Sequence, residues 1–169
     1  DIFSNKRMFR ILQWDVGSGK TIVCLLAISN VIESGYQCAF MGPTEILARQ
    51  HFELAKKIYK DTNLKIDFIT GKTDSKNRKQ ILENLQNGKT NLLIGTHSLF
   101  QKKIIFKKLG LAIIDEQHKF GVKQRSELAK KGGDNCDVLL MSATPIPRTM
   151  MMSLYGDMDV SKITEKPAK

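Results

Sequence analysis

The sequence predicts an α/β domain in which helices cover both faces of a mainly parallel sheet. Two observations lead to this prediction: short apolar runs alternate with segments of helical periodicity, and a polar cluster follows the end of each of the five clearest runs. With 169 residues, the chain has the length of one domain, which buries roughly 70% of the surface of its unfolded chain. A substantial hydrophobic core is therefore expected.

The expected strands are apolar runs that are too short for helices and rich in branched side chains. They span residues 9–13, 38–41, 91–94, 111–114 and 138–141, with a sixth candidate at 65–69. Between them, apolar residues recur at helical spacing, for example across residues 46–58 and 81–85. An earlier helix, expected at residues 21–32 with the sequence "TIVCLLAISNVI", is apolar nearly all round. It is expected to end at Gly35 and to pack deep against the sheet.

Composition narrows the classes of partner and compartment. Lys and Arg number 27 and Asp and Glu 17, and the net charge of +10 favours a polyanionic partner, nucleic acid before an acidic membrane surface. Cys24, Cys38 and Cys136 form no CxxC pair, and we expect buried free thiols in a reducing compartment. No apolar stretch reaches the ~18 residues of a membrane span, and the N-terminus lacks a secretion-signal pattern. These features predict a cytoplasmic protein without a membrane partner.

Polar clusters follow the five clearest apolar runs. They read "WDVGSGKT", "GPTE", "GTHS", "DEQH" and "SATPIPRT" in chain order. Because open parallel sheets bind ligands beyond the carboxyl ends of their strands, clusters from distant parts of the sequence are expected to meet at one edge. The sequence therefore predicts a single composite site.

The first cluster has the pattern of a phosphate-binding loop between a strand and a helix. Its glycines let backbone N–H groups face a phosphate at a helix N-terminus, Lys20 is placed to reach the β and γ phosphates, and the Thr21 hydroxyl is placed to ligate Mg²⁺. The alternative, a chance glycine turn with a surface lysine, is disfavoured by the flanking strand and helix. We expect ATP and Mg²⁺ as cofactors. The candidate nucleotide-binding residues are Asp15, Val16, Gly17, Ser18, Gly19, Lys20 and Thr21.

An acidic pair follows the run "LGLAII". Asp115 is expected at a fixed position at the sheet edge where it can hold a metal ion, and Glu116 is expected to face an attacking water. The alternative is an ordinary acidic turn at the end of a strand. Next to a phosphate loop, the pair predicts ATP hydrolysis.

The histidines and basic clusters carry less information. His51 lies in the amphipathic second helix and is interpreted as a packed or solvated residue, and no two histidines have the spacing of metal ligands. The basic segments at 76–79, 101–108 and 130–131 are interpreted as solvated faces.

With these motifs in order, the chain resembles the RecG family, bacterial ATP-dependent DNA helicases of superfamily 2 that remodel branched DNA. The resemblance rests on "DVGSGKT", "GPTEILARQH", "GTHSLFQ", "LAIIDEQHKFGVKQR", "MSATPIPRT" and "YGDMDVSKI", between about Arg10 and Pro167. Transcription-repair coupling factor shares similar runs but usually has a second glutamate where Gln117 stands. The resemblance implies a three-layer P-loop NTPase (RecA-like) fold, with the helicase ATP-binding domain at 1–162 and the start of a linker to a second motor lobe at 163–169.

The resemblance also implies residue roles. Lys20, Asp115, Glu116, Gln117 and His118 would form the catalytic set, with Thr21 and Asp115 on the metal. The residues expected to line the DNA track or to couple it to the nucleotide are Pro43, Thr44, Glu45, Gly95, Thr96, His97, Ser142, Ala143 and Thr144. The implied partners are branched or duplex DNA, bound independently of base sequence, and the wedge domain and second motor lobe of a monomeric helicase.

Two departures from the family pattern affect the function expected of the chain. The sequence lacks the adenine-contacting segment, the wedge domain and the second lobe with its arginine finger, so slow or absent hydrolysis is expected of the isolated chain. Trp14 stands where the loop pattern has its first glycine, and we expect it to weaken nucleotide binding. The alternatives are a non-catalytic or vestigial DNA-binding fragment and, disfavoured by "SATPIPRT" and "DEQH", a small-molecule kinase.

Overall fold

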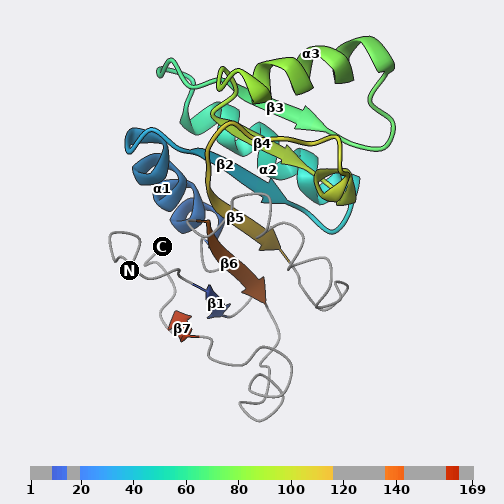
Figure 1. The fold of residues 1–169 in the computed structure, drawn as a ribbon. Coiled ribbons are helices and arrows are strands. Elements are labelled where there is room, and N and C mark those ends of the chain that lie inside the picture. Colours follow the sequence, from blue (N-terminus) through green and yellow to red (C-terminus); the bar gives the residue numbers. More distant parts are fainter. Residues whose placement is uncertain (1–8, 15–19, 116–135, 143–158, 164–169) are drawn as a thin grey trace.

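A seven-stranded sheet forms the centre of the structure, and every hydrogen-bonded pair of strands is parallel (Figure 1). The computed structural model describes residues 9–14, 20–115, 136–142 and 159–163. The strand order across the sheet is β3-β4-β2-β5-β6-β1-β7. The strands are β1 (Phe9–Trp14), β2 (Gln37–Met41), β3 (Ile66–Ile69), β4 (Leu92–Gly95), β5 (Leu109–Asp115), β6 (Asp137–Ser142) and β7 (Asp159–Ile163).

Helices pack on both faces of this sheet. The elements are α1 (Lys20–Glu33), α2 (Glu45–Ile58), α3 (Ser75–Gln86) and the 3-10 helix η1 (His97–Phe100). Side chains alternate between the two faces along each strand. Cys38 and Phe40 of β2 pack with α1 and α2 on one face of the sheet, whereas Ala39 and Met41 pack with α3 and η1 on the other face. The predicted three-layer fold is confirmed. No helix in the described ranges is long and apolar enough to cross a membrane.

Local signals in the sequence explain where the helices begin and end. The Thr44 hydroxyl accepts a hydrogen bond from the Leu47 N–H at the start of α2, and Asp74 caps α3 in the same way through the N–H of Asn77. The α1 helix ends at Glu33, and Gly35 then adopts a positive φ of 82° with its N–H on the Ile32 carbonyl. The predicted stop at Gly35 is confirmed.

One expectation about the elements holds only in part, and one strand was not anticipated. The α1 helix is buried on only one side, because Ile22 is 50% and Leu26 62% exposed. A helix covers a sheet with one side only. Apolar residues on its other side can therefore remain exposed. The strand β7 was not anticipated, because its sequence "DVSKI" forms no apolar run. An edge strand has one neighbour and does not require such a run. The predicted linker begins at residue 163, which is the last residue of β7, and this division between domain and linker stays a prediction.

The cysteines match the sequence-based expectation. Cys24, Cys38 and Cys136 are free and buried. Burial raises the pKa of the Cys24 thiol to about 12, with the Asp115 carboxylate as the second cause, and it also raises the pKa of Cys38. The Cys24 and Cys38 thiols therefore stay neutral at physiological pH and act as small apolar core residues.

Candidate functional site

Five neighbouring strands bring candidate residues to one edge of the sheet. The strands β4, β2, β5, β6 and β1 are adjacent and parallel, so their carboxyl ends lie in a row. Gly95 is the last residue of β4, Asp115 of β5, Ser142 of β6 and Trp14 of β1. Segments that are far apart in the sequence thus meet at the edge where open parallel sheets bind ligands.

Lys20 and Asp115 lie at the same part of this edge. Lys20 is the first residue of α1, directly after the segment that follows β1. The buried Cys24 thiol lies one turn later in α1 and is affected by both charges. Burial is the largest cause of its raised pKa, the Asp115 carboxylate raises this pKa further, and the Lys20 ammonium lowers it. The cation that begins α1 and the carboxylate that ends β5 thus both lie near this thiol. Their joint role at one phosphate–metal group stays a prediction.

Asp115 is held in an almost dry position. The alternation of β5 places it on the same face as Leu111 and Ile113, which pack against α1 and α2, and only 5% of it is exposed. Its Oδ2 lies 2.7 Å from Nε2 of His51. Its Oδ1 is buried and has no hydrogen-bond partner within the described part of the chain. A buried carboxylate with one oxygen hydrogen-bonded and the other without a partner is suited to act as a ligand of a cation.

His51 was missed as a site residue. It is packed, in agreement with its interpretation as a packed or solvated residue, since it is 8% exposed. Its short hydrogen bond to Asp115 was not anticipated. The available signal was its position between Ala48 and Ala55 on the buried face of α2, where an ionisable side chain needs a polar partner.

The metal-binding prediction concerns Mg²⁺, which proteins usually hold through one or two carboxylates together with substrate phosphates. Asp115 with its open Oδ1 fits this requirement, and Thr21 lies in the first turn of α1. Within the described ranges, no group of three or more His, Cys, Asp and Glu side chains forms a cage for a metal ion.

Several predicted site residues lie outside the described residues. They are Asp15, Val16, Gly17, Ser18 and Gly19 of the loop, Glu116, Gln117 and His118 of the acidic segment, and Ala143 and Thr144 after β6. The side chain of Trp14 also lies outside the described part, although its backbone pairs with Ile163 of β7. The roles expected of these residues stay predictions.

The two segments predicted to contact DNA lie next to each other. Pro43 and Thr44 follow β2, and Thr96 and His97 follow β4, and these strands pair in register from Cys38 with Leu92 onward. The N–H of Gly42 donates to the Gly95 carbonyl at 2.9 Å, which joins the two segments just beyond the strand ends. The sequence-predicted DNA residues therefore form one continuous stretch of the edge.

Close packing explains the glycine in each segment. A Cβ on Gly95 would lie 2.2 Å from the carbonyl oxygen of Ile69, and one on Gly42 would lie 2.7 Å from the backbone nitrogen of Ala48. Both neighbours are main-chain atoms that cannot turn aside. Gly95 thus has a packing role at this edge that is independent of any contact with DNA.

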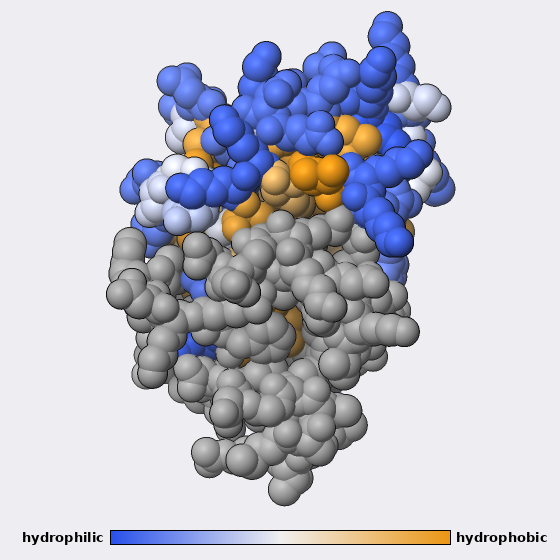
Figure 2. Space-filling model, in the orientation of Figure 1, coloured by the Kyte–Doolittle hydropathy of each residue, from blue (hydrophilic) through white to orange (hydrophobic). Residues whose placement is uncertain are grey.

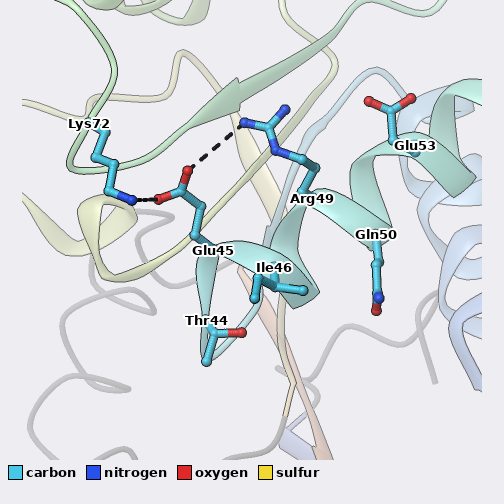
Figure 3. Close-up of a pocket in the computed structure, with 7 residues that line it drawn as sticks. All are labelled: Thr44, Glu45, Ile46, Arg49, Gln50, Glu53 and Lys72. Carbon is cyan, nitrogen blue, oxygen red and sulfur yellow. Dashed lines mark ion pairs between the residues drawn. The ribbon is translucent and has the colours of Figure 1, made fainter.

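A pocket of about 720 Å³ opens beside the N-terminus of α2 (Figure 3). It is lined by Thr44, Glu45, Ile46, Arg49, Gln50, Glu53 and Lys72. Glu45, a predicted DNA-track residue, points towards two cations: its carboxylate is 3.2 Å from Lys72 Nζ and 4.0 Å from Arg49 Nη2. These exposed ion pairs contribute little to stability, but they offset a negative charge where a phosphate backbone is expected.

The basic segment at 76–79 is largely a solvated face, as predicted. Lys76 and Lys79 of α3 are exposed, and Figure 2 shows hydrophilic side chains gathered over this helix with hydrophobic ones in a strip below. Arg78 differs, since it donates to the Thr70 carbonyl at 2.6 Å and to Gln101 Oε1 at 2.9 Å. It joins α3 to the segments that follow β3 and η1.

Comparisons with known proteins agree with this fold. The family model of DEAD/DEAH box helicases matches residues 1–153. The "ATP-dependent DNA helicase RecG" of Borreliella burgdorferi is 50% identical over 167 residues, and that of Bacillus subtilis is 49% identical over 168 residues. Each alignment covers 99% of this chain and 24% of the relative, so the chain spans about a quarter of the length of these proteins.

Solved structures show the same relationship. A structure of RecG bound to a three-way DNA junction superposes with a TM-score of 0.84 at 45% identity, covering 99% of this chain and 22% of that one. The Hef helicase domain of Pyrococcus furiosus, at a TM-score of 0.72 and 18% identity over 94% of this chain and 35% of that one, shares the fold. By its sequence match and its fold, the chain belongs to the DEAD/DEAH box helicase family and is similar over almost its whole length to the RecG helicases.

Proposed function

We propose that the chain is the ATP-binding motor lobe of an ATP-dependent DNA helicase that remodels branched DNA such as replication forks and Holliday junctions. The observation that carries this proposal is the buried Asp115 carboxylate, which presents an open Oδ1 at the same sheet edge as Lys20. The similarity to RecG, including the structure of that protein on a three-way DNA junction, supports the choice of branched DNA.

In this proposal each residue of the edge has a defined task. Lys20 binds the β and γ phosphates of ATP, Thr21 and Asp115 hold Mg²⁺, and Glu116 positions the attacking water. A Mg²⁺ ion held by these residues would supply positive charge that offsets the charge of the phosphates. The residues proposed to couple the nucleotide to DNA are Gln117, His118, Ser142, Ala143 and Thr144.

DNA is proposed to bind along the adjoining stretch of the edge that carries Pro43, Thr44, Glu45, Thr96 and His97. Hydroxyl and main-chain groups there can contact phosphates, which gives binding without base preference. The net charge of +10 favours the same partner. We further propose that the protein acts as a monomer in the cytoplasm.

The remaining parts of the helicase complete the activity. We infer that a second motor lobe supplies an arginine finger, which contributes roughly 10³- to 10⁵-fold to phosphoryl transfer, and that a wedge domain separates the DNA branches. The relatives are about four times as long as this chain, which leaves room for both. The isolated chain is therefore expected to bind ATP and to turn it over very slowly.

The test compares the full-length protein with its Lys20→Ala variant. ATP hydrolysis is measured with and without a three-way DNA junction, and junction unwinding and DNA binding are measured on the same preparations. We expect DNA-stimulated hydrolysis and unwinding in the wild type, and loss of both with retained DNA binding in the variant. A protein that binds the junction without hydrolysing ATP would instead support the alternative of a non-catalytic DNA-binding domain.

A further inference from the structure

His51 is the largest of the three buried residues of α2. Ala48 and Ala55, one turn before and after, have no exposed surface, and their small side chains let the helix approach the sheet closely. His51 occupies the space between them and is 8% exposed. Its ring is therefore held by the core rather than by solvent.

The ring is fixed from two directions. It stacks on Phe40, with ring centroids 4.5 Å apart and an interplanar angle of 20°. Phe40 pairs in register with Ile113, and Asp115 lies two residues further along the same face of β5. The imidazole thus contacts Phe40 near the end of β2 and Asp115 at the end of β5, where its Nε2–H donates to the Asp115 Oδ2 at 2.7 Å. Stacking sets the plane of the ring, and the hydrogen bond sets its direction.

This contact decides which oxygen of Asp115 is free. A carboxylate that rotated about its Cβ–Cγ bond could present either oxygen, but the bond from His51 engages Oδ2. The buried Oδ1 then has no hydrogen-bond partner within the described residues and remains for a ligand. Partners that orient a metal ligand in this way commonly determine both its geometry and its affinity.

We propose that His51 is a positioning residue that holds the Asp115 carboxylate in the orientation required to bind the metal ion of a bound Mg²⁺–nucleotide. The inference rests on the proposed function, because it requires a nucleotide at this edge. His51 acts through Asp115 and contacts neither nucleotide nor metal. A purely structural His51 would stabilise the fold without affecting the dependence of nucleotide binding on Mg²⁺.

The test uses the full-length protein and a fluorescent ATP analogue, whose Kd is measured with excess Mg²⁺ and with EDTA. The ratio of the two Kd values gives the effect of the metal on binding. His51→Gln places an amide N–H at about the distance of Nε2 from the backbone, whereas His51→Asn is one methylene shorter and cannot reach Oδ2. The two amide variants form a matched pair, and His51→Leu removes the donor altogether.

We expect His51→Leu and His51→Asn to reduce the metal effect on the order of 10-fold, the lower end of the range for partners of metal ligands. His51→Gln should restore most of it, and the Kd in EDTA should stay within about twofold throughout, because the metal-free complex does not use Asp115 as a ligand. In an Asp115→Asn background, His51→Leu should cause no further loss, since two residues that act as a unit are not additive.

Three results would overturn the inference. If His51→Leu and His51→Asn leave the metal effect unchanged while the wild type binds nucleotide, the positioning role is wrong and the proposed function stands. If their Kd rises equally in Mg²⁺ and in EDTA, His51 serves only to pack the core. If the wild type binds no nucleotide under either condition, the proposed function fails and the inference fails with it.

Discussion

The side chain of Gln37 offers a stringent test of how the sheet is held to its surroundings. It is 4% exposed at the start of β2. Its Nε2 donates to the carbonyls of Leu85 at 2.9 Å and Thr90 at 2.8 Å, and its Oε1 accepts from the Lys108 N–H at 2.9 Å. One amide thus joins the end of α3, the segment before β4 and the segment before β5.

Gln37→Leu keeps the approximate size of the side chain and removes all three hydrogen bonds. At about 1 kcal/mol for each bond, the loss is about 3 kcal/mol. The Leu85 carbonyl keeps a second partner, the Gly88 N–H at 3.1 Å, which reduces the cost at that site. We therefore expect a decrease of about 2–3 kcal/mol in the free energy of unfolding, a substantial share of the ~5–15 kcal/mol of a typical domain.

Gln37→Glu separates hydrogen bonding from shape. It keeps the acceptor for the Lys108 N–H but places a carboxylate oxygen against two carbonyl oxygens, so at pH 7 it should destabilise more than Gln37→Leu. Burial and the carbonyls raise the pKa of the introduced carboxyl above its unfolded value. The loss should therefore shrink as the pH falls through that raised pKa, where the protonated group can donate one bond.

Urea unfolding of the 169-residue chain and both variants, followed by circular dichroism, measures these differences as shifts in midpoint at constant slope. A cost below about 1 kcal/mol for Gln37→Leu would show that the three hydrogen bonds are replaced by water at little cost. Wild-type stability of Gln37→Glu at pH 7 would refute the assigned geometry, because the two carbonyls could not then face this side chain.

The remaining predictions concern the nucleotide loop, DNA binding and the buried thiols. Trp14→Gly should tighten Mg–ATP binding by about 1–3 kcal/mol if the indole crowds the loop, the usual cost of overpacking; calorimetric titration measures it, and tight binding by the unaltered chain would refute the crowding. DNA binding by the chain should be weak, indifferent to base sequence and strongly reduced by salt; titration of labelled duplex and forked DNA at two salt concentrations checks this, and a salt-insensitive affinity would contradict it. Cys24, whose pKa burial raises to about 12, should resist alkylation by iodoacetamide at pH 8 in the folded chain and react fully in urea. Rapid labelling of Cys24 in the folded chain at pH 8 would contradict its burial. Because the pKa of Cys24 in the folded chain lies above the ordinary value of 9.0, the contribution of this thiol to stability is complete below pH 9 and is lost as the pH rises towards 12.

The sequence was sufficient for most of the fold. Apolar runs such as 111–114 marked buried strands because both faces of a parallel sheet are covered, and Gly35 marked the end of α1 because the chain turns there with a positive φ. The placement of Asp115 and Lys20 at the same edge also follows from the sequence, since parallel strands place all their carboxyl ends on the same side. These features depend on local patterns and on one topological rule.

Contacts between distant side chains could not be predicted in the same way. His51 and Asp115 are 64 positions apart, and their pairing depends on which face of the sheet α2 covers and how the helix is rotated. The bonds of Gln37 span 48, 53 and 71 positions and depend on three separate chain segments. A polar residue at a buried position shows that a partner is needed, but the fold decides which partner it finds.

We propose that the edge carrying Lys20 and Asp115 binds a Mg²⁺–nucleotide. A crystal structure of the full-length protein with Mg²⁺ and a non-hydrolysable ATP analogue tests it most directly. We expect phosphate oxygens within hydrogen-bonding distance of Lys20 Nζ, the metal ion on the Oδ1 side of Asp115, and Oδ2 still bonded to His51. A nucleotide bound elsewhere, or an Asp115 carboxylate that faces away from the metal, would contradict it.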